Sequence, residues 1–260
     1  QKIEPENTVN DLIGQMEVEI EKDRNSAVGW RYLMQPWLRT PLMIAVCIMF
    51  FQQFVGINTV IYYSPKIFLM AGFESTLSAI WASVGIGIVN VVFTVISLYL
   101  VDRIGRRKLY FIGLSGIAFS VLCLSACFIY ANQLGEIGRW LMVIFMFGYV
   151  AFFAISIGPL GWLVISEIFP QKVRGLGTSI GSLAVWIFNC IVSFTFFKII
   201  DFFSIPGTEI VVGQTTSENP AGAFFLYGFI AVLGLVWGYL FLPETKGLSL
   251  EEIEQKWRKN

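Results

Sequence analysis

Five side chains that can form hydrogen bonds lie within twelve residues of one strongly apolar stretch, namely Gln52, Gln53, Asn58, Tyr62 and Tyr63. A side-chain amide both donates and accepts hydrogen bonds, which suits the paired hydroxyl groups of a sugar. Buried polar groups need partners, so this concentration predicts either a bound ligand or hydrogen bonds between helices. The clustering of five such groups favours the ligand.

Two further amides and two indoles extend this candidate substrate-binding set. Asn90 and Asn189 fall at similar depth in other apolar stretches, where each fits a structural or a ligand-binding role equally well. The apolar C–H face of a pyranose ring packs well on an indole, and Trp162 and Trp186 are the best placed for this. The predicted binding residues are therefore Gln52, Gln53, Asn58, Asn90, Trp162, Trp186 and Asn189.

The elements that must position these side chains are six stretches without Asp, Glu, Lys or Arg: 40–65, 75–101, 109–135, 140–166, 175–197 and 219–243. A helix needs roughly 20 residues to cross the hydrocarbon core, and each stretch exceeds that length. A soluble helical protein would show solvated faces in them, and a spanning β-barrel would show short alternating segments. With 56% hydrophobic and 14% charged residues, the chain is predicted to be an all-α integral membrane protein with a six-transmembrane-helix bundle.

Basic residues are distributed unevenly between the loops on the two sides of the predicted membrane. Of 18 Lys and Arg residues, 15 fall on one side and only Lys66, Arg139 and Lys198 fall on the other. The positive-inside rule then predicts a multi-pass protein of the plasma (inner) membrane with both termini in the cytoplasm. The formal net charge of zero offers no basic surface for nucleic acid.

Three regions follow from this pattern. Residues 1–39 are predicted to be a cytoplasmic amphipathic helical linker, with Leu12, Ile13, Met16 and Ile20 at helical spacing. A flexible linker is the alternative, because short helices are marginal on their own. Residues 40–243 form the six-helix domain, and residues 244–260 form a cytoplasmic tail.

Glycine and proline interrupt two of the six spans. The first is expected to break at Gly56 and the fourth at Gly158, Pro159 and Gly161. These positions correspond if the bundle is a 3+3 inverted repeat. Because broken backbone is tolerated only where it is buried in protein or lines a cavity, the two breaks predict a binding site near the middle of the membrane.

Charged side chains at the cytoplasmic ends of the spans include carboxylates, which control of topology by positive charge does not explain. Ion pairs between helix ends could hold that side shut and release when it opens. The predicted cytoplasmic latch consists of Asp102, Arg103, Arg106, Arg107, Glu167, Arg174 and Glu244.

Three motifs carry a resemblance to a known family: Gln52-Gln53-Phe54-Val55-Gly56-Ile57-Asn58, Asp102-Arg103-Ile104-Gly105-Arg106-Arg107 and Pro243-Glu244-Thr245-Lys246-Gly247. Together they resemble the signatures of the sugar porter family of the major facilitator superfamily. The resemblance covers essentially the whole chain and identifies it as the second six-helix half of a twelve-span transporter.

The resemblance implies alternating access, with a monosaccharide held between this half and an N-terminal six-helix half that the chain lacks. It implies sugar binding by Gln52, Gln53, Asn58, Asn90 and Trp162, outer closure by Tyr62 and Tyr63, and the latch described above.

Two departures bear on the substrate and its coupling. Ala154 stands where passive glucose facilitators carry glutamate, as in proton-coupled relatives, and Val185 stands where many members carry Asn or Gln. Val185 removes one possible hydrogen bond to the sugar. The uncharged stretches hold no carboxylate and the chain has no histidine, so a proton carrier is expected in the other half.

The leading prediction is the C-terminal half of a sugar transporter for a hexose or pentose, working by proton symport in the intact protein and inactive alone. A membrane sugar sensor and a channel or structural subunit are the alternatives. An enzyme is disfavoured, because no nucleophile with a base and no metal-binding set is present, and no cofactor or metal is expected.

Overall fold

The computed structural model describes residues 30–73, 75–204, 210–212, 215–248 and 250–259. Within them, six helical stretches are long and apolar enough to cross a membrane: Pro36–Met70, Thr76–Ile104, Arg106–Ile129, Ala131–Ile168, Gln171–Phe202 and Ala221–Phe241. Their mean hydropathy lies between 1.9 and 2.3. The predicted fold class, a helical membrane bundle of six spans, is confirmed.

Two of these spans are each divided into two α-helices. The short helices α2 (Trp30–Leu33) and η1 (Pro36–Leu38) lead into the first span, which consists of α3 (Arg39–Phe54) and α4 (Ile57–Met70). The second and third spans are α5 (Thr76–Ile104) and α6 (Arg106–Ile129), and the fourth consists of α7 (Ala131–Ile155) and α8 (Ile157–Ile168). The fifth is η2 (Gln171–Val173) with α9 (Arg174–Phe202), the sixth is α10 (Ala221–Phe241), and α11 (Leu250–Lys259) follows.

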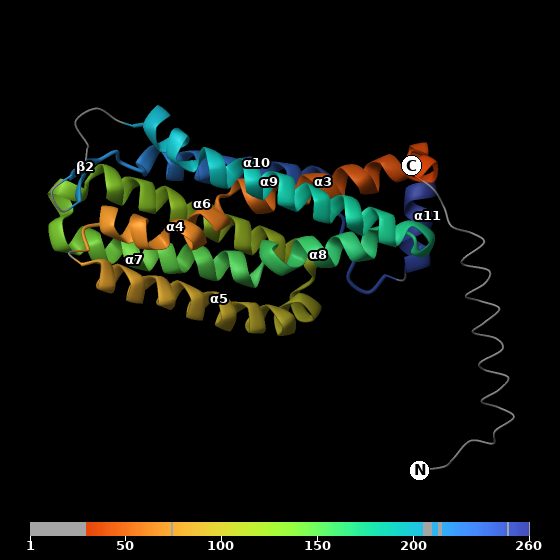
Figure 1. Ribbon diagram of the computed structural model, residues 1–260. Helices are drawn as coiled ribbons and strands as arrows, with labels where there is room; N and C mark the ends of the chain where they lie inside the picture. The colour runs from red at the N-terminus through yellow and green to blue at the C-terminus, as the bar shows by residue number, and fades with distance from the viewer. Residues whose placement is uncertain (1–29, 74, 205–209, 213–214, 249, 260) are drawn as a thin grey trace, which may run out of the picture.

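The long helices run side by side, with α11 across one end of the bundle (Figure 1). At the opposite end lies an antiparallel ribbon of β1 (Ile210–Val212) and β2 (Thr215–Ser217), paired through Val211 and Thr216. We call these the α11 end and the ribbon end. The sequence pattern did not predict this ribbon.

Helices α6 and α10 pack closely through aromatic side chains and a hydrogen bond to the backbone. The rings of Phe128 and Phe224 stack with centroids 5.6 Å apart. The Tyr110 hydroxyl donates to the Gly234 carbonyl at 2.9 Å, which satisfies a buried hydroxyl that has no access to water. A Cβ atom added at Gly238 would lie 2.4 Å from the Tyr110 ring, so only glycine fits there.

Helix α5 presents an almost fully apolar outer surface. Leu77, Trp81, Ile88, Val91 and Leu98 are each at least 60% exposed. Such a surface is unstable in water, so α5 must face lipid or another apolar protein surface.

The two predicted regions outside the six spans, residues 1–39 and 244–260, have different outcomes. The amphipathic helix expected around Leu12, Ile13, Met16 and Ile20 lies outside the described residues. The tail at 244–260, for which no structure was predicted, contains α11, whose Trp257 packs against the core.

Candidate functional site

The first span breaks at Gly56, between α3 and α4. The backbone there is left-handed, with φ 86° and ψ 17°. A Cβ atom added at Gly56 would lie 2.2 Å from a ring carbon of Tyr227, so both conformation and packing require glycine. The Tyr149 hydroxyl donates to the Val55 carbonyl at 2.9 Å and satisfies an acceptor beside the break. The interruption predicted at Gly56 is confirmed.

The fourth span breaks at Ser156, where φ is −128° and ψ is −104°. The prediction placed this interruption at Gly158, Pro159 and Gly161, which instead lie inside α8. Proline lacks an N–H and its ring clashes with the carbonyl four residues earlier, so it is tolerated in the first turn of a helix. Pro159 therefore occupies that turn, and the helix is broken just before it.

Gln52 joins the two broken spans. Its Nε2 donates to the Ile157 carbonyl at 3.1 Å and to the Gly158 carbonyl at 2.6 Å. The side chain is buried, and its Oε1 has no hydrogen-bond partner among the described residues. Since an unpaired buried acceptor costs about 1–3 kcal/mol, this oxygen is well suited to accept from a ligand hydroxyl.

A chain of amides connects α3, α4 and α9. The Asn58 Nδ2 donates to Gln53 Oε1 at 2.7 Å and to Asn189 Oδ1 at 2.9 Å. Asn189 Nδ2 in turn donates to the Tyr62 hydroxyl at 3.4 Å. Hydrogen bonding between helices, the alternative left open by the sequence, is thus part of the role of these amides.

All seven predicted substrate-binding residues nevertheless line one cavity of about 430 Å³, together with Tyr62. Small-molecule sites typically occupy roughly 300–1,000 Å³. Trp162 and Trp186 are 42% and 67% exposed, so their indole rings remain free to contact a ligand. The full lining is Gln52, Gln53, Ile57, Asn58, Tyr62, Asn90, Thr94, Phe153, Ala154, Gly158, Pro159, Trp162, Val185, Trp186 and Asn189.

Tyr63, the second residue of the predicted outer gate, lies outside this lining. Its hydroxyl donates to the Ser193 carbonyl at 3.3 Å, and its ring stacks on Phe196 with centroids 5.5 Å apart. The two tyrosines therefore point to different surroundings, because consecutive residues of a helix face different directions.

Thr94 is a cavity residue that the sequence analysis missed. It lies one turn after Asn90 on α5, and its hydroxyl donates to the Asn90 carbonyl at 2.8 Å. The spacing of four residues places both side chains on one helix face, and this signal could have identified Thr94.

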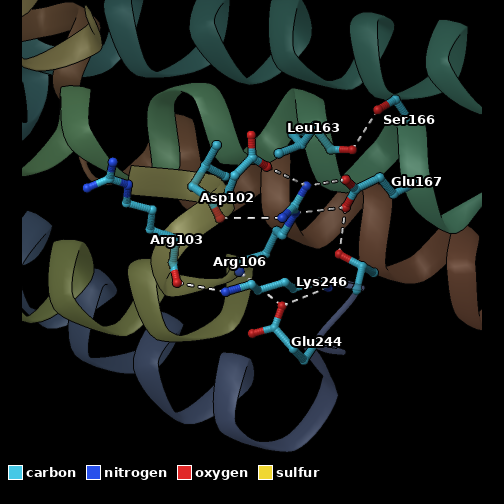
Figure 2. A network of polar contacts seen from close by, with 10 residues as sticks. Asp102, Arg103, Arg106, Leu163, Ser166, Glu167, Glu244 and Lys246 are labelled. Atoms are coloured by element: carbon cyan, nitrogen blue, oxygen red, sulfur yellow. Dashed lines mark hydrogen bonds and ion pairs between the residues drawn. The ribbon is translucent and has the colours of Figure 1, made fainter. Parts of the chain in front are cut away.

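The charged residues at the α11 end form a contact network that we call the charged cluster, defined as Asp102, Arg106, Glu167, Glu244 and Lys246 (Figure 2). At its centre, Arg106 binds Glu167 through two bonds, Nη2 to Oε1 at 2.8 Å and Nε to Oε2 at 3.3 Å. Both side chains are largely buried, at 12% and 19% exposed, while Asp102, 3.3 Å from Arg106, is 76% exposed. The Arg106–Glu167 pair therefore dominates the cluster.

Glu244 closes the network by capping the start of α6. Its carboxylate accepts the backbone N–H groups of Arg106 at 3.0 Å and Arg107 at 3.1 Å. A carboxylate at a helix N-terminus is stabilised by the unpaired N–H groups and the helix dipole. The Lys246 Nζ donates to the Arg103 carbonyl at 2.7 Å, which ties the segment after α10 to the end of α5.

Three predicted latch arginines stand apart from the ion pairs. The Arg107 Nη2 donates to the Tyr239 carbonyl at 2.7 Å, and Arg103 joins the network through its backbone carbonyl. The Nε and Nη2 atoms of Arg174 are buried and have no partner among the described residues. Among all residues that the structure describes, no group of three or more His, Cys, Asp or Glu side chains could hold a metal ion.

Comparison with known proteins gives consistent matches. A family model described as "Sugar (and other) transporter" matches residues 1–257. The chain is 38% identical over 229 residues to a glucose transporter of Staphylococcus epidermidis, covering 88% of the chain and 47% of that relative. It is 35% identical over 241 residues to a D-xylose-proton symporter of Escherichia coli, covering 93% of the chain and 46% of that relative.

The solved structures agree with these matches. The structure of the proton:xylose symporter XylE bound to 6-bromo-6-deoxy-D-glucose matches with a TM-score of 0.72 and 34% identity. The match covers 95% of this chain and 49% of that one. The chain thus spans about half the length of the curated relatives it matches.

Proposed function

This chain belongs to the sugar transporter family, and we propose that it forms the C-terminal six-helix half of a transporter that carries a monosaccharide across a membrane. In the intact protein a second half would face the cavity and complete the site. This half alone would not transport. The coverage of about half of each relative supports that division.

The observation that carries the proposal is the cavity between the two broken spans. It combines the amides of Gln52, Gln53 and Asn58 with the indoles of Trp162 and Trp186. Amides can both donate to and accept from the hydroxyls of one sugar, while an indole packs on its C–H face. Gln52 Oε1 is buried without a partner among the described residues, and a sugar hydroxyl that reached it would supply the missing donor.

Alternating access would use the two ends of the bundle. At the ribbon end, Tyr62 lines the cavity and contacts Asn189, which places a candidate gate next to the binding amides. At the α11 end, the charged cluster joins the ends of α5, α6 and α8 to the segment after α10. Its release would let these helix ends separate, while substrate binding biases the balance between the two states.

The proposed substrate is a hexose or a pentose. Relatives named as a glucose transporter and a D-xylose-proton symporter support both sizes. Val185 lines the cavity with an apolar side chain, so the hydroxyl nearest to it gains no hydrogen bond from this position.

Transport is proposed to be coupled to protons, as the name of the xylose relative suggests. The cavity lining contains no carboxylate and no histidine. A group that binds and releases the proton near neutral pH would therefore lie in the other half of the intact protein.

We also propose that the chain lies in the plasma (inner) membrane with both termini in the cytoplasm. The α11 end carries the basic side chains of Arg103, Arg106, Arg107 and Lys246, which the positive-inside rule assigns to the cytoplasmic side.

Uptake of labelled glucose and xylose by vesicles containing the intact protein tests this function. Uptake is expected to saturate, to be competed by unlabelled sugar, and to increase with an inward proton gradient. Vesicles without protein are the control. Linear uptake without saturation would indicate a channel, and sugar binding without uptake would indicate a sensor.

A further inference from the structure

A second cavity, of about 420 Å³, lies at the α11 end between the last turn of α10 and α11. Its lining is Arg107, Tyr239, Leu240, Phe241, Leu242, Pro243, Glu244, Thr245, Leu248, Ile253, Lys256 and Trp257. None of these residues belongs to the central cavity. We call it the α10–α11 cavity.

One wall of this cavity continues onto an exposed apolar surface. Tyr239, Leu240 and Phe241 are 71%, 63% and 45% exposed. Among the described residues, α6 and α10 contribute none to the lining of the central cavity, so this surface is directed away from it. In a membrane-spanning helix such a surface faces the hydrocarbon of the bilayer.

Two cations border the cavity, and one of them is held in place. The Arg107 Nη2 donates to the Tyr239 carbonyl at 2.7 Å, and its guanidinium lies 5.9 Å from the centroid of the Tyr239 ring. Lys256 is exposed on α11. Neither side chain forms an ion pair within the described part of the chain.

The single carboxylate in the lining is already occupied. Glu244 accepts backbone N–H groups from Arg106, Arg107 and Lys246 at 3.0, 3.1 and 3.1 Å. Its charge is therefore directed to the start of α6, and it does not pair with either cation. The cavity as a whole is suited to an anion.

Trp257 supplies a second, independent observation. Its Nε1 is buried and has no hydrogen-bond partner among the described residues, although Trp257 lines the cavity. A buried indole N–H normally has an acceptor, because leaving it unpaired is costly. An acceptor atom inside the cavity would remove that cost.

We propose that the α10–α11 cavity binds the phosphate head group of an anionic phospholipid from the leaflet at this end. Lys256 and Arg107 would contact the phosphate, and Trp257 Nε1 would donate to a phosphate or ester oxygen. The acyl chains would lie along Tyr239, Leu240 and Phe241. This apolar wall favours a lipid over a free phosphate, which would gain nothing from it.

The test is native mass spectrometry of the intact protein in detergent, with phosphatidylglycerol and phosphatidylcholine of identical acyl chains added at matched ratios. Phosphatidylglycerol is expected to bind more tightly. Lys256→Gln should weaken its binding about fivefold, as expected for one basic group near a lipid head group. Trp257→Phe, which keeps an aromatic ring but removes the N–H together with part of the indole, should weaken it about tenfold.

Lys172→Gln is the matched control, because Lys172 is exposed between α8 and α9 and is not part of this cavity. Binding by that variant should equal the unmodified protein. Equal binding of the two lipids, or equal loss in the Lys172 and Lys256 variants, would overturn the proposal. Displacement of the lipid by glycerol 3-phosphate at equal concentration would show a site for soluble phosphates and would also overturn it. The assay needs no transport, so its outcome is separable from that of the uptake experiment.

Discussion

Val185 and Gln52 show how single side chains set the chemistry of the central cavity. The Gln52 amide nitrogen donates two hydrogen bonds to backbone carbonyls of α8, and its oxygen remains unpaired among the described residues. Val185 lies in the same lining but can form no hydrogen bond. Under the proposed function, Gln52 would offer an acceptor to the sugar, and Val185 would leave part of the sugar without a partner.

Val185→Asn is expected to raise the affinity for sugar roughly tenfold, because a buried hydroxyl gains a hydrogen bond worth about 1–1.5 kcal/mol. Quenching of tryptophan fluorescence by sugar in the intact protein would measure this, since two indoles line the cavity. Val185→Leu changes the size of the side chain without adding a polar group, and should bring no gain. A gain in both variants would show that shape, and not hydrogen bonding, limits affinity at this position.

Helices and their breaks were largely predictable, and the exceptions have physical causes. Stretches without charged residues predicted the six spans. Gly56 predicted the first break, because only glycine adopts its left-handed backbone at no steric cost. The second break was placed too late, since Pro159 forces the interruption upstream of itself. The separation of Tyr62 from Tyr63 depends on tertiary packing against α9, which local sequence does not reveal.

Gly56→Ala is expected to lower the free energy of unfolding by at least about 1–2 kcal/mol, the cost of a left-handed backbone for a residue with a Cβ atom. The clash with Tyr227 adds to this. The melting temperature of the purified intact protein measures the loss. Gly87→Ala is the control, because nothing lies within 4 Å of a Cβ atom added in the middle of α5. A stable Gly56→Ala protein would contradict the packing described here.

In the molecule as a whole, the cavity and the charged contacts occupy different places along the bundle. The central cavity lies between the broken spans. Charged side chains join the helices at the α11 end (Figure 2). The charged residues could be selected from the sequence, but not their partners: Arg106 with Glu167, and Glu244 with the backbone of α6. Pairing over 61 residues of separation requires the assembled bundle.

Glu167→Gln should favour opening of the α11 end, because the largely buried Arg106 guanidinium then lacks its buried carboxylate partner and keeps only the exposed Asp102. Breaking such a pair costs on the order of 3–5 kcal/mol. Distances between spin labels on the two halves of the intact protein would show a larger open population. Asp102→Asn, at a position 76% exposed, should change little, since exposed pairs contribute about 0–1 kcal/mol. Identical distance distributions in the two variants would argue against the latch.

Equilibrium binding of glucose or xylose to the purified intact protein tests most directly whether the central cavity holds sugar. Compared with the unmodified protein, Gln52→Ala should weaken binding at least about tenfold, because a buried hydroxyl loses its acceptor. Gln133→Ala, which removes an exposed amide outside the cavity, should bind as the unmodified protein does. Equal affinity in all three proteins would contradict the assignment of this cavity as the sugar site.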